Sequence, residues 1–166
     1  SYDGDMDLSG MRFGFDPSAY EAGNALDKQA MDTAKDVMAS LGANIVEVST
    51  PKRDVSPLGL QLSVEAAAAF QDLTLTGRDD EMRRQVTNAW PHVFREAHMV
   101  SAVDLVQVDR LRRLAMQDMA DMFDTCDVLV GPNYANSMLL ITNYTGQPQL
   151  SIPCGFEERE LNVAWR

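Results

Sequence analysis

Four neighbouring residues near the C-terminal end of the chain could contact a small ligand: Thr142, Asn143, Thr145 and Gly146. Their hydroxyl and amide groups can donate and accept hydrogen bonds, and the glycine lets a ligand approach the backbone closely. We predict that residues 142–148 form a loop on the wall of a pocket, with Asn143 and Thr145 as the main contacts. The alternative, that these two side chains only satisfy the backbone of a turn, is equally compatible with the sequence.

Two motifs that suggest metal binding are incomplete. Asp3, Asp5 and Asp7 alternate as in a calcium loop, but the glycine and glutamate that complete such a loop are missing. His92 and His98 are six residues apart, so they cannot share one face of a helix with a third ligand nearby. We therefore predict an acidic linker at the N-terminal end, no metal site and no cofactor.

The candidate nucleophiles and bases are equally weak. Ser49 and Lys52 have the spacing of a serine–lysine pair, but Pro51 stands where a helical turn would have to bring them together. Glu65 has no acid or histidine three or four residues away to share general acid–base work. The glycines are isolated and form no phosphate-binding loop.

The composition favours an ordinary α/β domain. The chain has 166 residues, 45% of them hydrophobic, which is enough for one core. A net charge of −11 argues against nucleic-acid phosphates or anionic membranes as partners. No apolar run approaches the roughly 18 residues that span a bilayer. We expect a soluble, cytoplasmic protein in which Cys126 and Cys154 are reduced and buried.

The positions of the elements follow from periodicity and capping residues. A strand over 11–15, a helix capped by Asn24 and Asp27, and a strand over 44–48 predict a β-α-β unit. The apolar face of that helix would comprise Leu26, Ala30, Ala34, Val37, Met38 and Leu41.

The remainder of the chain is expected to be mainly helical. We predict helices over 56–73, capped by Ser56, and over about 90–123, with a kink or break near Ser101, and buried strands within 126–156. Val128–Val130 should be buried on both faces. The resulting fold is a single α/β domain, residues 1–166, in which helices flank a mixed β-sheet. Residues 1–10 would be its acidic linker.

Several segments together resemble the amidase signature family, which includes glutamyl-tRNA amidotransferase A subunits. The segments are Leu41-Gly42-Ala43, Val46-Glu47-Val48, Glu65-Ala66-Ala67, Thr76-Gly77, Gln107 to Arg113, Asp127 to Pro132, and Thr142 to Pro148 with Ile152 to Phe156. Their shared order over some 150 residues carries the resemblance, and it matches the C-terminal part of the family.

The resemblance implies an amide hydrolase in which a serine, a second serine after a cis peptide bond, and a lysine act together. A desolvated, neutral lysine can accept the proton of the nucleophilic serine through the bridging serine. Such an enzyme needs a Gly/Ser-rich loop, yet the chain has no Gly-Gly, Ser-Ser or Gly-Ser pair, and its lysines are Lys28, Lys35 and Lys52. We expect Lys28 and Lys35 to lie on the outer face of their helix.

The family function is therefore expected from a larger protein rather than from these residues alone. The chain would supply a pocket wall for a small amide while the catalytic segment lies upstream, and its partners would be that N-terminal segment or a second copy in a homodimer. Arg112 could pair with a substrate carboxylate, although a surface or intramolecular ion pair is favoured. Two alternatives remain: an inactive small-molecule binding module, or a protein-interaction domain.

Overall fold

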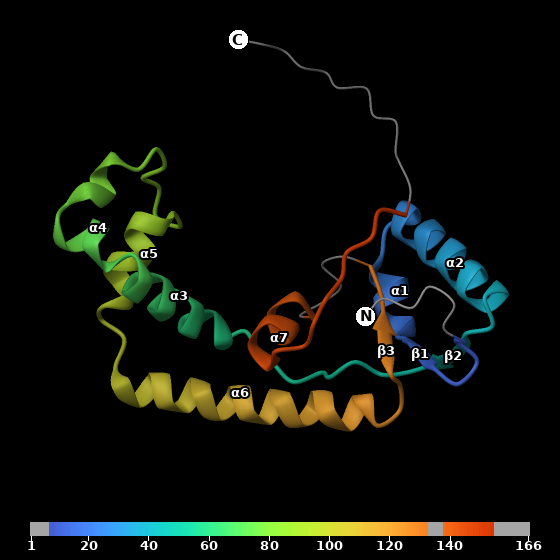
Figure 1. Ribbon diagram of the computed structural model, residues 1–166. Helices are drawn as coiled ribbons and strands as arrows, with labels where there is room; N and C mark the ends of the chain where they lie inside the picture. Colours follow the sequence, from blue (N-terminus) through green and yellow to red (C-terminus); the bar gives the residue numbers. More distant parts are fainter. Residues whose placement is uncertain (1–6, 133–137, 155–166) are drawn as a thin grey trace, which may run out of the picture. The chain divides into compact units, whose positions relative to one another are not determined.

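The chain's secondary structure in the computed structural model is α/β, as the sequence predicted (Figure 1). The structure describes residues 7–132 and 138–154. Where the sequence suggested one domain, these residues fall into two compact units. Unit 1 contains residues up to Thr50 together with 121–132 and 148–154, and unit 2 contains Pro51–Ala120 and residues 138–147. The predicted linker over 1–10 lies largely outside the described residues.

Unit 1 is built on a three-stranded parallel sheet. Its strands are β1 (Arg12–Phe15), β2 (Asn44–Glu47) and β3 (Val128–Val130), in the order β2-β1-β3. Phe13 of β1 lies opposite Ile45 on one side and Val128 on the other. The predicted β-α-β unit is confirmed, because the parallel strands β1 and β2 are joined by helices.

Two helices connect β1 to β2. The short helix α1 (Pro17–Ala22) was not predicted from the sequence. Asp16 caps it, and Pro17 occupies its first turn, where a missing N–H costs nothing. The second helix, α2 (Ala25–Ser40), begins with the predicted capping box of Asn24 and Asp27, and Gly42 follows its end with a φ of 84°.

The buried face of α2 differs from the prediction. Met31, which was not on the predicted face, is buried, whereas Val37 and Leu41 are exposed. The ammonium of Lys35 lies 5.1 Å from the centre of the Phe15 ring and 4.9 Å from that of Tyr20, and Lys28 also lies over Tyr20. The prediction that both lysines lie on an outer face is thus wrong, since their ammonium groups lie over aromatic rings and both side chains are half-buried.

The helices of unit 2 are shorter than the predicted ones. In place of one helix over 56–73 there are α3 (Leu58–Ala69) and α4 (Gln71–Leu75). The predicted cap by Ser56 is not formed. The helix begins after Pro57 without a side-chain cap, and the Ser56 backbone N–H donates to the Asp54 carboxylate. The break falls at Phe70, whose ring stacks on Phe94 with centroids 5.5 Å apart.

The predicted helix over about 90–123 is interrupted as well. It consists of α5 (Trp90–Ala97) and α6 (Ala102–Phe123), preceded by the short 3-10 helix η1 (Arg78–Glu81). The break falls where a kink was predicted. The Ser101 hydroxyl accepts a hydrogen bond from the N–H of Asp104 and donates to its carboxylate, so Ser101 starts a new helix.

A small apolar cluster joins α3 to α5. Ala67 of α3 and Phe94 and Ala97 of α5 are buried together, and Val64, Ala66 and Met82 pack around them. The small side chains of Ala67 and Ala97 allow the two helices to approach closely. This cluster fixes the direction of α3, which carries Glu65.

The segment from Cys126 to Cys154 contradicts three predictions. β3 is only partly buried rather than buried on both faces, because β1 is the one strand paired with it among the described residues. Leu150 and Ile152 form no strand and are 80% and 70% exposed. Cys126 is buried as predicted, whereas Cys154 is exposed, and both thiols are free. Residues 155–166 lie outside the described part.

None of the helices in the described ranges has the length and apolar character needed to cross a membrane.

Candidate functional site

The four predicted ligand-binding residues lie in a helix and at its end, not in a loop. Helix α7 (Met138–Thr145) contains Thr142, Asn143 and Thr145, and Gly146 follows it with a φ of 80°. The N–H groups of Gly146 and Gln147 both donate to the carbonyl of Thr142, which closes the last turn. The glycine provides the left-handed conformation that ends the helix.

The polar side chains of α7 bond back to carbonyls of their own helix. The Thr142 hydroxyl donates to the carbonyl of Met138, and the Asn143 amide donates to that of Leu139. The Thr145 hydroxyl is buried and bonds to the Ile141 carbonyl. Hydroxyl and amide groups keep further hydrogen-bonding capacity after such bonds, so these residues remain our proposed ligand contacts.

Arg112 of α6 binds the C-terminal end of α7. Its Nε donates a 2.8 Å hydrogen bond to the carbonyl oxygen of Tyr144, and its Nη1 lies 3.5 Å from the Asp109 carboxylate. A guanidinium is favourable there because the last carbonyls of a helix carry partial negative charge and lack helical partners. From the sequence, Arg112 could contact a substrate or form a surface or intramolecular ion pair. In the structure its guanidinium holds the C-terminal end of α7 in place.

Tyr144 points its hydroxyl into the protein. The oxygen is buried and has no hydrogen-bond partner among the described residues. Burial raises the pKa of the Tyr144 phenol, and the negative charge of Glu65 raises it further. Glu65 lies on α3, which packs against α7 within unit 2. Sequence reasoning considered Glu65 alone and missed Tyr144, because nothing local indicated that α3 and α7 would meet.

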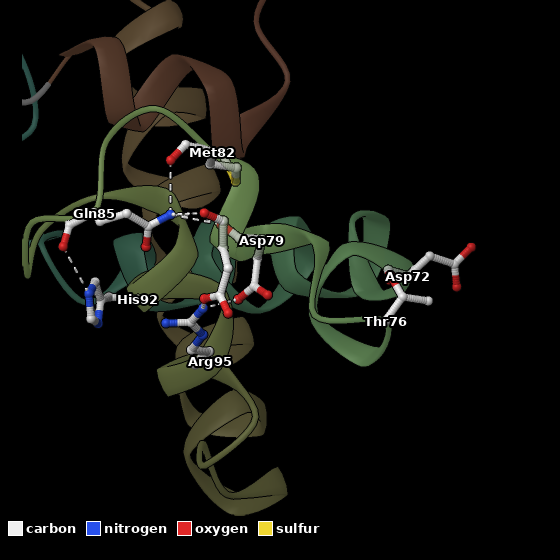
Figure 2. Close-up of polar contacts among 8 residues, drawn as sticks. Asp72, Thr76, Asp79, Met82, Gln85, His92 and Arg95 are labelled. Atoms are coloured by element: carbon white, nitrogen blue, oxygen red, sulfur yellow. Dashed lines mark hydrogen bonds and ion pairs between the residues drawn. The ribbon is translucent and has the colours of Figure 1, made fainter.

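A second polar cluster lies in the segment between α4 and α5 and is shown in Figure 2. The buried carboxylate of Asp79 lies 2.6 Å from Nη2 of Arg95, which also contacts Asp80. The Gln85 amide donates to the carbonyls of Asp79 and Met82. Each of these groups binds another part of the same segment, so the cluster holds the fold of η1 and the loop after it.

His92 belongs to this cluster. Its Nε2 lies 3.2 Å from the carbonyl of Gln85 (Figure 2). Among the residues that the structure describes, no group of three or more histidine, cysteine or acidic side chains could hold a metal ion.

Unit 1 has a buried carboxylate where ligands often bind in parallel sheets, beyond the carboxyl ends of the strands. Asp16 follows β1 and accepts hydrogen bonds from the backbone N–H and hydroxyl of both Ser18 and Thr50. Burial alone would raise the pKa of Asp16, but these four bonds outweigh it and lower the pKa. Since both oxygens are already used, Asp16 caps α1 and ties β1 to the segment after β2.

The fold and the site together define an α/β protein with a small parallel sheet and a helical unit that holds a polar helix end. No protein-family profile and no solved structure matches the chain. Curated sequences do match. Over 93% of its length the chain is 27% identical to the A subunit of the glutamyl-tRNA(Gln) amidotransferase of Janthinobacterium sp. (strain Marseille). Over 94% of its length it is 26% identical to the corresponding protein of Herminiimonas arsenicoxydans.

These relatives confirm the resemblance to the amidase signature family. The chain spans about two fifths of their length, 40% and 41% respectively, which is consistent with a C-terminal portion of such a protein.

Proposed function

We propose that this chain is the C-terminal part of an amidase signature enzyme that cleaves carbon–nitrogen amide bonds. The observation that carries the proposal is the similarity to amidotransferase A subunits over more than nine tenths of the chain. In this proposal the serine, cis-serine and lysine belong to an upstream segment, and the present residues hold the substrate. The partners are then a small amide and that N-terminal segment.

The positions of the lysines support a missing triad. Lys28 and Lys35 lie over aromatic rings of unit 1, and Lys52 is exposed. A general-base lysine must be desolvated and next to its serine, and none of the three lysines has such a setting. We therefore expect the chain alone to be inactive.

The end of α7 is the proposed substrate-binding wall. Asn143 is exposed and Thr145 buried, so the amide of Asn143 can reach a ligand directly. The bond from Arg112 holds the last turn of the helix, which fixes the direction of Thr145 and Gly146. This helix end replaces the predicted loop as the element that would position these residues against an amide.

Reconstitution tests this function. The chain is expressed alone and together with the part of the Janthinobacterium protein that it does not match, and ammonia release from L-glutamine and from propionamide is followed. We expect no release by the chain alone and release by the co-purified pair. Replacement Asn143→Ala should raise the KM of the pair, whereas Asn44→Ala, on β2 of unit 1, should not. Ammonia release by the chain alone, blocked by a serine-directed inhibitor, would refute the proposal.

A protein-interaction module is the second candidate, and α6 favours it. Val103 and Val106 are 68% and 52% exposed, and Leu114, which is 45% exposed, shares their face at helical spacing. A second copy of the chain could cover this face. Size exclusion and a hydrophobic dye separate the candidates, because a monomer that binds no dye would argue against an uncovered interface.

A further inference from the structure

Within unit 2, one side of α6 packs on the protein and the opposite side is exposed. The buried side is marked by residues at spacings of seven and four: Val108, Ala115 and Met119. The exposed side includes five residues that we call the outer face of α6: Val103, Val106, Arg110, Arg113 and Leu114. Steps of three and four residues keep them on one side, because the helix turns once in 3.6 residues. The outer face is thus an apolar stripe that contains two arginines.

The acidic side chains of α6 within unit 2 are already bound elsewhere in the chain. The acids and their partners are Asp104 with Ser101, Asp109 with Arg112, and Asp118 with Arg53. The Arg110 guanidinium donates a 3.4 Å hydrogen bond to the Gln107 side chain. Among the described residues, no carboxylate pairs with Arg110 or Arg113. The outer face therefore carries two uncompensated positive charges in a chain whose net charge is −11.

A second copy of the chain fits these charges poorly. In an antiparallel pair of α6 helices, the register that sets Val106 on Leu114 of the second copy also sets Arg110 on its own counterpart. In a parallel pair, Arg110 and Arg113 would each lie opposite their counterparts. Like charges opposed at an interface disfavour binding. An occupant that covers the apolar stripe must therefore bring negative charge.

We propose that the outer face of α6 binds an acidic amphipathic helix of another protein. Apolar side chains of that helix pack on Val103, Val106 and Leu114, and two carboxylates one turn apart pair with Arg110 and Arg113. Burial of the aliphatic side chains favours the complex, and the charge pairs fix its register. Because the rest of the chain is acidic, it repels such a partner and directs it to this face.

This inference does not involve the end of α7 and is independent of amide cleavage. It rests on the second candidate, the protein-interaction module, and it names the chemistry of the partner.

The test uses the full chain and a fluorescein-labelled peptide of about 18 residues, or five helical turns, with a stripe of leucines flanked by glutamates. A basic counterpart has lysines in place of the glutamates. Fluorescence anisotropy should show saturable binding of the acidic peptide, with a Kd of about 50 µM that rises with added salt. The basic peptide should bind at least about tenfold more weakly. No saturation by about 500 µM protein, or equal binding of both peptides, would refute the proposal.

Charge reversal tests the two arginines. Arg110→Glu together with Arg113→Glu should weaken binding of the acidic peptide at least about tenfold and produce saturable binding of the basic peptide, which also shows that the variant is folded. The control Arg83→Glu with Arg84→Glu makes the same change in net charge on the exposed loop after η1. It should change the affinity for the acidic peptide less than about twofold. An unchanged preference in the reversed variant, or an equal loss in the control, would refute the proposal.

A valine substitution tests the apolar stripe. Val106→Ser should weaken binding of the acidic peptide about fivefold, because it removes aliphatic surface from the contact. The control Val86→Ser replaces a similarly exposed valine on the loop before α5 and should leave the affinity unchanged. Full affinity in Val106→Ser would mean that the contact is purely ionic, and it would refute the proposal.

Two measurements test other occupants of the outer face. Self-association in sedimentation that the acidic peptide abolishes would assign the face to a second copy and refute the proposal. Binding to phosphatidylglycerol vesicles that the acidic peptide displaces would assign it to a membrane surface and refute it as well.

The outcome is separate from the tests of the two candidate functions. Ammonia release by the reconstituted pair without binding of the acidic peptide would refute the helix partner and leave the amidase proposal in place. Binding of the hydrophobic dye without binding of the peptide would also refute the helix partner, and it would leave an interaction module with a different partner.

Discussion

The carboxylate of Asp127 accepts hydrogen bonds from both the backbone N–H and the guanidinium of Arg12, which lies 115 residues earlier in the chain. The Asp127 backbone N–H in turn donates to the Arg12 carbonyl, and Nη1 of Arg12 reaches the carbonyl of Asp124. These bonds set β3 beside β1 at the point where both strands begin. They hold together two parts of unit 1 that lie far apart in the sequence.

The first prediction concerns acid stability. The bonds from Arg12 lower the pKa of Asp127 to about 2, from the 3.8 that is usual for an aspartate. Because the folded-state pKa is depressed, the contribution of Asp127 to stability is complete above about pH 4 and is lost as the pH falls toward 2. In urea unfolding, Asp127→Asn should lower the urea midpoint at pH 5. The midpoint of this variant should also fall less than that of the wild type between pH 5 and pH 2.5. Asp124→Asn, which keeps the backbone carbonyl that Arg12 uses, should behave as wild type.

The second prediction concerns the close contact between Gly14 and Cys126. A Cβ added at Gly14 would lie 2.9 Å from the Cys126 sulfur and 2.9 Å from a methyl of Val48. Gly14→Ala should therefore destabilise the protein by about 1–3 kcal/mol through overpacking. Adding Cys126→Ala should recover part of this loss, because it removes one of the two clashes.

Gly10 is the matched control for that experiment. A Cβ there meets no atom within 4 Å. Gly10→Ala should change the stability by less than about 0.5 kcal/mol. A Gly14→Ala variant as stable as Gly10→Ala would contradict the packing of β1 on Cys126.

The third prediction concerns the ion pair of Asp79 and Arg95. Asp79 is nearly fully buried and Arg95 is its charge partner. Arg95→Met should destabilise unit 2 by about 3 kcal/mol, because it leaves a buried carboxylate without a partner. The double variant Arg95→Met with Asp79→Asn should be more stable than Arg95→Met alone.

Arg78 provides the control for the ion pair. It forms an exposed contact with Glu81 in the same segment. Arg78→Met should cost less than about 1 kcal/mol in chemical unfolding, as exposed pairs do. Equal losses of stability in Arg78→Met and Arg95→Met would contradict the idea that the burial of Asp79 makes its ion pair with Arg95 important for stability.

The fourth prediction concerns thiol reactivity. Cys126 is fully buried, and burial raises the pKa of its thiol, whereas Cys154 is exposed. A disulfide reagent at pH 8 should modify Cys154 rapidly and Cys126 only when the protein opens. The variant Cys154→Ser should therefore show almost no fast phase, and a fast phase of full amplitude in that variant would contradict the burial of Cys126.

Features that depend on neighbouring residues could be predicted directly from the amino-acid sequence. The capping box of Asn24 and Asp27 and the break at Ser101 arise from side chains within four residues of the backbone groups they bond. The end at Gly42 arises from the left-handed conformation that a glycine adopts without strain. The order of motifs also sufficed to indicate the family.

Features that depend on distant contacts required the folded structure. Lys35 turned inward because the ring of Phe15 offered a packing surface, and the run around Leu150 stayed exposed because no described strand pairs with it. The polar run from Thr142 formed a helix whose last turn Arg112 holds from α6. Local pattern predicts caps and turns because both partners are close in the chain, whereas the packing of α3 against α7 brings together segments that are more than 60 residues apart.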